Sequence, residues 1–216
     1  MSSKPFTLNY SQPEEYRFSQ DSVETPWWIA AHFRGEKKRP RRVLDLCAGS
    51  GVMGFELACF LSGEYPIDFL EIQSAYRTHF DENQRRFEAS NFSAGVGGRF
   101  RWLEMNYADL RVETPGHAYD LILCNPPYFE VEHGKVSAGD FKSRCRFFID
   151  ASSDELWNAI ERVLAPGGEA FVLVRTEDAH GTSVLKNLER RFRYSAAVEI
   201  AADIRGTSLI RIEKKS

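Results

Sequence analysis

Short, continuous apolar runs alternate with longer amphipathic segments from about residue 42 onward. Apolar runs of this length are typical of buried strands, and apolar residues at intervals of three and four are typical of helices. The pattern predicts strands at 43–46, 67–72, 100–105, 120–124 and 170–174. It predicts helices at 52–61, 75–89, 156–164 and 184–192, of which the first would stop at Gly63 and the third at the turn Pro166-Gly167-Gly168.

The C-terminal part follows a different pattern. Residues 196–200 and 208–212 alternate apolar and polar side chains around Arg205 and Gly206, which predicts an antiparallel pair of strands. The earlier alternation of strands and helices predicts βαβ units. We therefore expect an α/β fold that is doubly wound and Rossmann-like. Its seven-stranded sheet would be mostly parallel, with an antiparallel edge strand and helices on both faces.

The first forty residues lie outside this pattern and are rich in aromatic side chains, including Trp27 and Trp28. We expect residues 1–40 to form an N-terminal extension or lid, and residues 41–216 to form one cofactor-binding domain. A chain of 216 residues with 43% hydrophobic content can bury a sizeable core in one such domain.

The cysteines and histidines bear on the redox compartment and on metal binding. The four cysteines form no C-x-x-C pair and the five histidines are dispersed, which argues for a reducing compartment and against a metal site. The sequence shows neither a signal-peptide pattern nor an apolar stretch of the roughly 18 residues that a membrane span needs. We expect a cytoplasmic protein with no metal and no membrane partner. The sequence does not indicate its oligomeric state.

The formal net charge of −3 does not favour nucleic-acid binding, but two local clusters are basic. One lies between Arg34 and Arg42, and the other comprises Lys142, Arg144 and Arg146. Each could be a solvated loop or could contact phosphates, since a basic patch can bind RNA even on a mildly acidic protein.

A glycine-rich loop follows the first strand and contains Ala48, Gly49 and Gly51, preceded by Asp45. Glycines there allow a tight turn and a close approach to a ligand at a helix N-terminus. Glu71, at the end of the next strand, could accept hydrogen bonds from ribose hydroxyls. The loop also satisfies G-x-G-x-x-G, so a dinucleotide enzyme is an alternative. The charge of Asp45 suits a cationic cofactor better than a pyrophosphate.

The tetrad Asn125-Pro126-Pro127-Tyr128 ends the strand predicted at 120–124. Proline cannot continue a central strand, so the tetrad gives up sheet regularity without adding core volume. It does suit a flat, amine-bearing substrate. Asn125 Oδ1 and the Pro126 carbonyl could accept hydrogen bonds from the two N–H groups, while Tyr128 and Phe129 offer faces for stacking.

Together, the loop Asp45-x-Cys47-x-Gly49-x-Gly51 and the tetrad resemble class I S-adenosylmethionine-dependent amino-methyltransferases. The family often has glycine where this chain has Cys47. The resemblance implies that Glu71 holds the cofactor ribose, that Ile72 packs on its adenine, and that Asn106 accepts a hydrogen bond from the adenine amino group. Asp109 is an adjacent candidate for the same contact, and either residue could instead be a turn-forming polar residue after the strand. The implied cofactor-binding residues are Phe18, Asp21, Asp45, Ala48, Gly49, Gly51, Glu71, Ile72, Asn106, Tyr107 and Asn125.

The implied catalytic residues are Asn125, Pro126 and Tyr128, and the implied substrate-binding residues are Pro127, Tyr128, Phe129, Lys142, Arg144 and Arg146. Residues 10–23, 71–73 and 125–129 narrow the resemblance to bacterial adenine-N-6 methyltransferases of a valine tRNA, over roughly residues 10 to 175. In that group the segment matching Phe18 to Asp21 covers the cofactor site. The chain departs from the group at residues 130–148 and at Trp27-Trp28, where an RNA would dock.

The resemblance thus predicts methylation of adenine N-6 in RNA, with tRNA as the partner. Four alternatives remain from the sequence. A protein glutamine amide presents the same two N–H groups, and a small amine or a DNA base could also be the acceptor. A methyltransferase-like subunit without activity is the fourth, although decay of the loop or the tetrad would then be expected.

Overall fold

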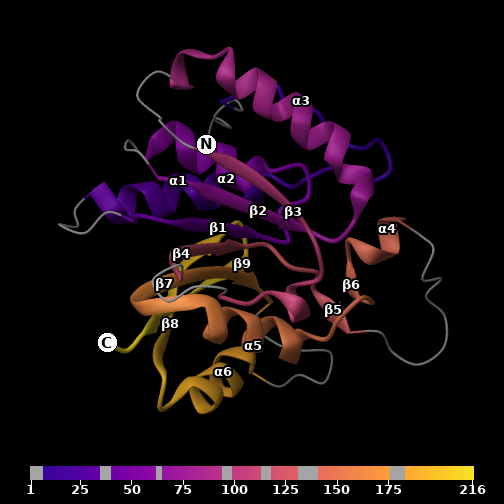
Figure 1. Cartoon of the computed structure of the whole chain (residues 1–216). Helices are drawn as coiled ribbons and strands as arrows, with labels where there is room; N and C mark the ends of the chain where they lie inside the picture. Colours follow the sequence, from indigo (N-terminus) through magenta and orange to yellow (C-terminus); the bar gives the residue numbers. More distant parts are fainter. Residues whose placement is uncertain are drawn as a thin grey trace.

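A seven-stranded sheet forms the centre of the computed structural model (Figure 1), which describes residues 7–34, 40–61, 65–93, 99–112, 118–130, 141–175 and 183–216. The strand order is β3-β2-β1-β4-β7-β9-β8. The strands are β1 (Val43–Leu46), β2 (Ile67–Glu71), β3 (Phe100–Glu104), β4 (Tyr119–Cys124), β7 (Leu164–Val174), β8 (Ala196–Ile204) and β9 (Thr207–Lys214).

Strands β3, β2, β1, β4 and β7 run parallel, while β9 is antiparallel to both of its neighbours, β7 and β8. The predicted mostly parallel sheet with an antiparallel edge is confirmed, and the antiparallel strand lies one position inside the outermost strand β8. Arg205 (φ 56) and Gly206 (φ 89) form the turn between β8 and β9, where both residues need a left-handed backbone.

Helices cover both faces of this sheet (Figure 1). On one face lie α1 (Asp21–Arg34), α2 (Val52–Phe60) and α3 (Arg77–Glu88), and on the other lie α5 (Ser153–Val163) and α6 (Val184–Phe192). Each face has its own core: Phe55, Phe69 and Phe80 are buried in the first, and Ile160 and Phe192 in the second. The two cores account for the all-buried pattern of the central strands β1 and β4.

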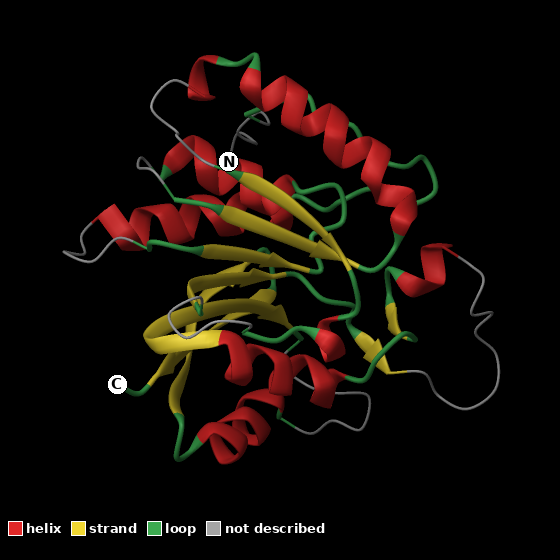
Figure 2. Ribbon diagram, in the orientation of Figure 1, coloured by secondary structure: helices red, strands yellow, loops and turns green. Residues whose placement is uncertain are grey.

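Short elements connect this frame. Figure 2 shows a small parallel pair beside the main sheet, made of β5 (Phe129–Glu130) and β6 (Phe147–Phe148), with α4 (Phe141–Arg144) next to it. Three 3₁₀ turns follow β2, α3 and β3: η1 (Ser74–Tyr76), η2 (Asn91–Ser93) and η3 (Tyr107–Asp109).

The predicted start of the fifth strand at residue 170 is wrong, because β7 begins at Leu164. Leu164 already pairs with Tyr119, and the regular register with β4 resumes at Glu169 opposite Leu121. The Pro166-Gly167-Gly168 segment is therefore an irregularity within the strand, with Gly167 in a left-handed conformation (φ 65), and not a turn that precedes it.

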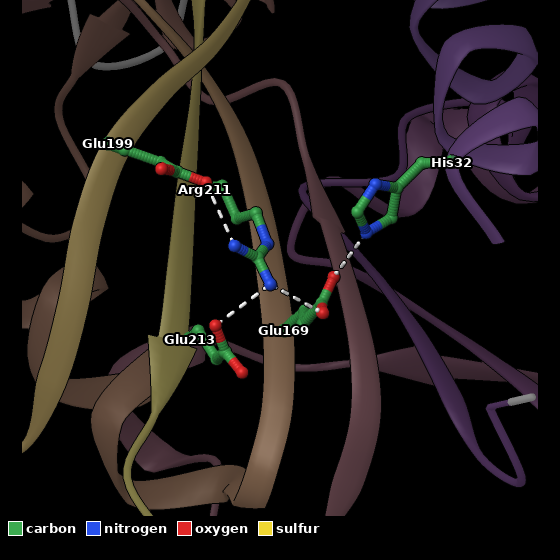
Figure 3. A network of polar contacts seen from close by, with 5 residues as sticks. All are labelled: His32, Glu169, Glu199, Arg211 and Glu213. Atoms are coloured by element: carbon green, nitrogen blue, oxygen red, sulfur yellow. Dashed lines mark hydrogen bonds and ion pairs between the residues drawn. The ribbon is translucent and has the colours of Figure 1, made fainter. Parts of the chain in front are cut away.

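Helix α1 is an element that the apolar pattern did not predict. It buries Val23, Ile29 and Ala30 completely in the same core as α2. Near its C-terminus, His32 contacts Glu169 of β7 at 3.0 Å, and Glu169 in turn pairs with Arg211 of β9 at 2.8 Å (Figure 3). Arg211 also pairs with Glu199 and Glu213, so one network of polar contacts ties α1 to three strands.

Candidate active site

A cavity of about 340 Å³ lies at the carboxyl ends of β1, β2 and β4. The order of the strands reverses there, since β2 and β4 flank β1 on opposite sides. Loops diverge at such a point and leave room for a ligand. Most of the residues that the sequence pointed to line this cavity: Phe18, Asp21, Asp45, Ala48, Gly49, Glu71, Ile72, Asn106, Tyr107, Asn125, Pro126, Pro127, Tyr128 and Arg144.

The glycine-rich loop is held in a left-handed backbone. Cys47 has φ 62, Gly49 has φ 53 and Gly51 has φ 81. Gly51 does not line the cavity, but its role in the loop is steric. A Cβ at this position would lie 2.8 Å from the ring of Phe55, closer than packed side chains approach. Gly51 therefore lets the loop sit directly on the first core.

Two buried acids hold the backbone of the loop and of the helix that follows it by hydrogen bonds. Asp45 Oδ2 accepts a hydrogen bond from Gly54 N at 2.8 Å, and Glu71 Oε2 accepts one from Gly49 N at 2.9 Å. Burial raises the pKa of Asp45 to about 8, against the lowering effect of the Gly54 N–H. Burial also raises the pKa of Glu71, although backbone N–H groups oppose it. A ligand with a positive charge and hydroxyl groups would stabilise the ionised form of both acids.

Gln73 is a site residue to which the sequence assigned no role, although it lies in the segment 71–73 that carries the resemblance. The residue is 6% exposed, and its Nε2 donates to Cys145 Sγ at 3.5 Å. Its Oε1 has no hydrogen-bond partner among the described residues. Because a buried acceptor without a partner costs about 1–3 kcal/mol, this oxygen fits a ligand that brings a donor to the cavity.

The tetrad places a side-chain amide at one end of the cavity. Asn125 follows β4 directly, and its Nδ2 donates to Ser22 Oγ at 3.1 Å. The Tyr128 hydroxyl donates to Asn125 Oδ1 at 2.5 Å. Burial and the charge of Asp21 raise the pKa of Tyr128, so the phenol stays protonated and can donate. Arg175 lies over the Tyr128 ring, 6.0 Å from its centre.

The N-terminal segment contributes part of the cavity wall. Gln12, Tyr16 and Phe18 line it. Asn83 of α3 anchors this segment, because its Oδ1 accepts from Ser11 N at 2.6 Å and its Nδ2 donates to Ser11 O at 2.9 Å. The same Nδ2 donates to Ser50 O in the glycine-rich loop at 2.9 Å. The role of residues 1–40 as a lid stays a prediction.

Asn106 and Tyr107 line the cavity but hold local contacts. Asn106 Oδ1 accepts from Ala108 N at 2.9 Å and caps η3, and its Nδ2 donates to Asp150 O at 2.9 Å. The Tyr107 hydroxyl donates to Ala151 O at 2.8 Å. The structure thus assigns Asn106 a turn-forming role. Its predicted contact with the cofactor adenine stays a prediction, as does that of Tyr107.

Of the three basic residues predicted to bind substrate, only one lines the cavity. Arg144 lines the cavity, forms a bidentate ion pair with Asp150 at 2.8 and 2.9 Å, and lies close enough to Glu71 to lower its pKa. Lys142 and Arg146 do not line the cavity. The Phe129 side chain and residues 35–39 and 131–140 lie outside the described residues.

Further site residues that sequence reasoning missed are Ser22, Cys145 and Arg175. Ser22 lies in the segment 10–23 that carries the resemblance but was given no role there, and Cys145 and Arg175 belong to no motif. The three come from separate segments, so only the fold brings them together. In the part of the chain that the structure describes, no three His, Cys, Asp or Glu side chains are grouped to hold a metal ion. No helix among the described residues is long and apolar enough to cross a membrane.

Comparison with known families agrees with this geometry. The model of the methyltransferase small domain matches residues 18–203. The chain belongs to this family. Its enzymatic class is therefore that of S-adenosylmethionine-dependent methyltransferases, and its cofactor is S-adenosylmethionine and not a dinucleotide. The glycine-rich loop, the two buried acids and the unpartnered Gln73 Oε1 fit a ligand with a positive charge, ribose hydroxyls and an adenine.

Among curated proteins, the tRNA1(Val) (adenine(37)-N6)-methyltransferase of Dickeya chrysanthemi is 29% identical over 62% of this chain and 49% of its own length. The protein of the same name from Aeromonas hydrophila is 31% identical over 63% of this chain and 52% of its own length. The chain thus spans about half the length of these relatives.

Solved structures share the fold at low identity. A candidate RNA methyltransferase from Pyrococcus horikoshii superposes with a TM-score of 0.62 at 14% identity, over 97% of this chain and 95% of that one. A precorrin-6y C5,15-methyltransferase from Geobacter metallireducens superposes with a TM-score of 0.53 at 14% identity, over 95% of both chains. Because enzymes for different acceptors share this fold, the fold leaves the substrate open.

Proposed function

We propose that this methyltransferase acts on the exocyclic amino nitrogen of adenine, N-6, in RNA, and that its substrate is a tRNA. The observation that carries the proposal is the position of the tetrad. It sets an amide oxygen and an aromatic ring side by side at one end of the cavity, in a chain whose relatives are named as tRNA adenine-N-6 methyltransferases.

The chemistry follows from the weakness of the nucleophile. The lone pair of an exocyclic amine is delocalised into the ring, so the nitrogen is planar and unreactive. Asn125 Oδ1 and the Pro126 carbonyl would accept its two N–H groups and favour a pyramidal nitrogen with its lone pair directed at the donor. S-adenosylmethionine, when bound, supplies an electrophilic methyl group on a sulfonium. No strong base is needed, because the nitrogen loses its proton readily once it is methylated.

The Tyr128 hydroxyl has a second role in this scheme. It donates to one lone pair of Asn125 Oδ1 and so helps to fix the amide, while the second lone pair can accept a substrate N–H. The Tyr128 ring would stack on the base, a contact that contributes about 1–3 kcal/mol per base in nucleic-acid complexes. A loop adenine reaches such a site at little cost, since it is already unstacked.

The acceptor assay tests the substrate. Methyl transfer from radiolabelled S-adenosylmethionine to total tRNA that lacks its own modifications should give N-6-methyladenosine, identified by nucleoside mass spectrometry. Unlabelled RNA, from an enzyme that still binds the cofactor, would contradict the proposal. The search would then turn to glutamine-containing proteins and small amines.

The Asn125→Ala variant tests the mechanism. Loss of a placed hydrogen-bond acceptor of this kind is expected to lower kcat by about 10²–10³-fold, while the affinity for S-adenosylmethionine changes little. Asn158→Ala, on the exposed face of α5, is the matched control and should keep the wild-type rate. A near-normal kcat for Asn125→Ala would show that another group activates the nitrogen.

A further inference from the structure

We infer that Ser22, from the N-terminal end of α1, is a positioning residue for Asn125. The inference rests on the proposed function, in which the Asn125 amide activates the acceptor nitrogen. It makes the N-terminal segment part of the catalytic arrangement, although Ser22 precedes the tetrad by 103 residues.

The contact acts on the one part of Asn125 that the backbone leaves free. Pro126 holds the Asn125 main chain in an extended conformation. The side-chain amide can still rotate, because the last torsion of asparagine has a broad energy minimum. In the structure both ends of this amide are engaged: Nδ2 donates to Ser22 Oγ at 3.1 Å, and Oδ1 accepts from the Tyr128 hydroxyl at 2.5 Å.

The contact with Ser22 leaves the reacting end of the amide free. Oδ1 has two lone pairs, which the Tyr128 hydroxyl and the acceptor N–H would share during the reaction. Ser22 Oγ binds the opposite end and does not compete with the acceptor. Its side chain is buried, with the residue 5% exposed, so water cannot easily take over the contact.

The position of Ser22 is itself set by buried structure. Its backbone N–H donates to Ser19 O at 3.1 Å in the first turn of α1. The helix is fixed on α2 by Trp27, whose Nε1 donates to Glu56 Oε2 at 2.7 Å. Glu56 is fully buried. A rigid, packed helix therefore presents the hydroxyl to the tetrad.

A pair of variants on this helix tests the inference. Ser22→Ala removes the hydroxyl that contacts Asn125. Thr25→Val removes a hydroxyl one turn further along α1 that is also buried, at 0% exposure, and has no hydrogen-bond partner among the described residues. With unmodified tRNA, Ser22→Ala should lower kcat by about three- to tenfold, the range that one neutral hydrogen bond corresponds to. The KM for S-adenosylmethionine should stay constant, and Thr25→Val should retain the wild-type kcat.

A second measurement does not depend on the acceptor. The side-chain amide of Asn125 gives a pair of resonances in a ¹⁵N-labelled sample, assigned by their loss in Asn125→Ala. Ser22→Ala should shift and broaden this pair, and Thr25→Val should leave it in place. Unchanged Asn125 resonances in Ser22→Ala, or an unchanged kcat, would overturn the inference. Failure of the wild type to methylate tRNA would instead contradict the proposed function, and the spectra would still decide the role of Ser22.

Discussion

At the scale of single residues, two buried aspartates show how local partners decide protonation. Asp45 is 1% exposed and accepts the Gly54 N–H, and burial raises its pKa to about 8. Burial alone would also raise the pKa of Asp68, but hydrogen bonds from Arg101, Tyr119 and Arg42 together outweigh it and hold the pKa below 3.8. The two carboxyl groups should therefore respond to pH in opposite senses.

For Asp45 we predict that the native protein loses stability as the pH rises. Its pKa is raised from 3.8 to about 8, so the unfolded chain releases this proton from about pH 4 upward while the folded chain keeps it. The contribution is complete below pH 4 and is lost progressively up to about pH 8. The asparagine of Asp45→Asn can still accept the Gly54 N–H, but its amide does not titrate in this pH range. Urea unfolding from pH 4.5 to 8.5 should give a flatter profile for the variant, and parallel profiles would contradict the pKa shift.

The glycines of the cofactor loop could be predicted from the sequence because each lies where the backbone is left-handed. Cys47 is an exception, because it has a left-handed backbone without being glycine. Its φ of 62 is a conformation that favours glycine, the residue frequent there in the family, and the chain tolerates the strain of a Cβ. The roles of Ser22, Gln73 and Arg175 could not be predicted. Ser22 and Gln73 lie in the segments 10–23 and 71–73 that carry the resemblance, but nothing in the sequence shows that their side chains reach the cavity. Their role depends on which elements the fold brings to the cavity.

At the scale of elements, Asp68 joins three strands and the residue before a fourth, toward the ends of the strands that lie away from the cavity. It lies in β2 and accepts from Arg101 of β3 at 2.9 and 3.0 Å, and from Tyr119 of β4 at 2.7 Å. Arg42, directly before β1, donates to it at 2.9 Å. The Asp68 side chain is 4% exposed, so these donors replace water almost completely.

Replacing Asp68 by asparagine should therefore destabilise the sheet by about 2–4 kcal/mol at neutral pH, because the arginines lose a buried partner. The depressed pKa sets the pH dependence. The stabilisation by Asp68 is complete above its unfolded pKa of about 3.9 and is lost as the pH falls through the lower folded value. The gap between wild type and Asp68→Asn should thus shrink below pH 4. Denaturant unfolding from pH 7 to 3 measures it, with Asp154→Asn on the surface as control, and a constant gap would contradict the prediction.

Regular elements were predictable where one local pattern dominated. The strand at 43–46 and the helix at 184–192 have the bounds that their apolar residues predict. Helix α1 was not predictable in this way, since it contains Pro26 and two adjacent tryptophans and has no clear apolar stripe. Packing on α2 and the Trp27–Glu56 hydrogen bond stabilise it. The early start of β7 likewise depends on its pairing with β4.

At the scale of the whole molecule, the N-terminal extension predicted at residues 1–40 packs closely on the domain predicted at residues 41–216. Tyr10, Val23, Ile29 and Phe33 share one core with α2 and α3. Buried Glu56 accepts hydrogen bonds from Thr7 at 2.7 Å, Tyr10 at 2.6 Å and Trp27 at 2.7 Å. The N-terminal segment thus supplies both apolar packing and polar partners to the cofactor domain.

We predict that residues 41–216 alone do not fold cooperatively. Each buried Val, Ile or Phe side chain contributes about 1.5–3 kcal/mol, so losing Val23, Ile29 and Phe33 removes several kcal/mol. Domains have only about 5–15 kcal/mol of net stability. Thermal unfolding followed by near-ultraviolet circular dichroism should show a cooperative transition for residues 7–216 and none for 41–216. Glu56→Gln, in the full chain, should lower Tm without abolishing the transition. If residues 41–216 unfold cooperatively at the Tm of the full chain, the N-terminal segment is only a covering, and its packing adds nothing to the stability of the fold.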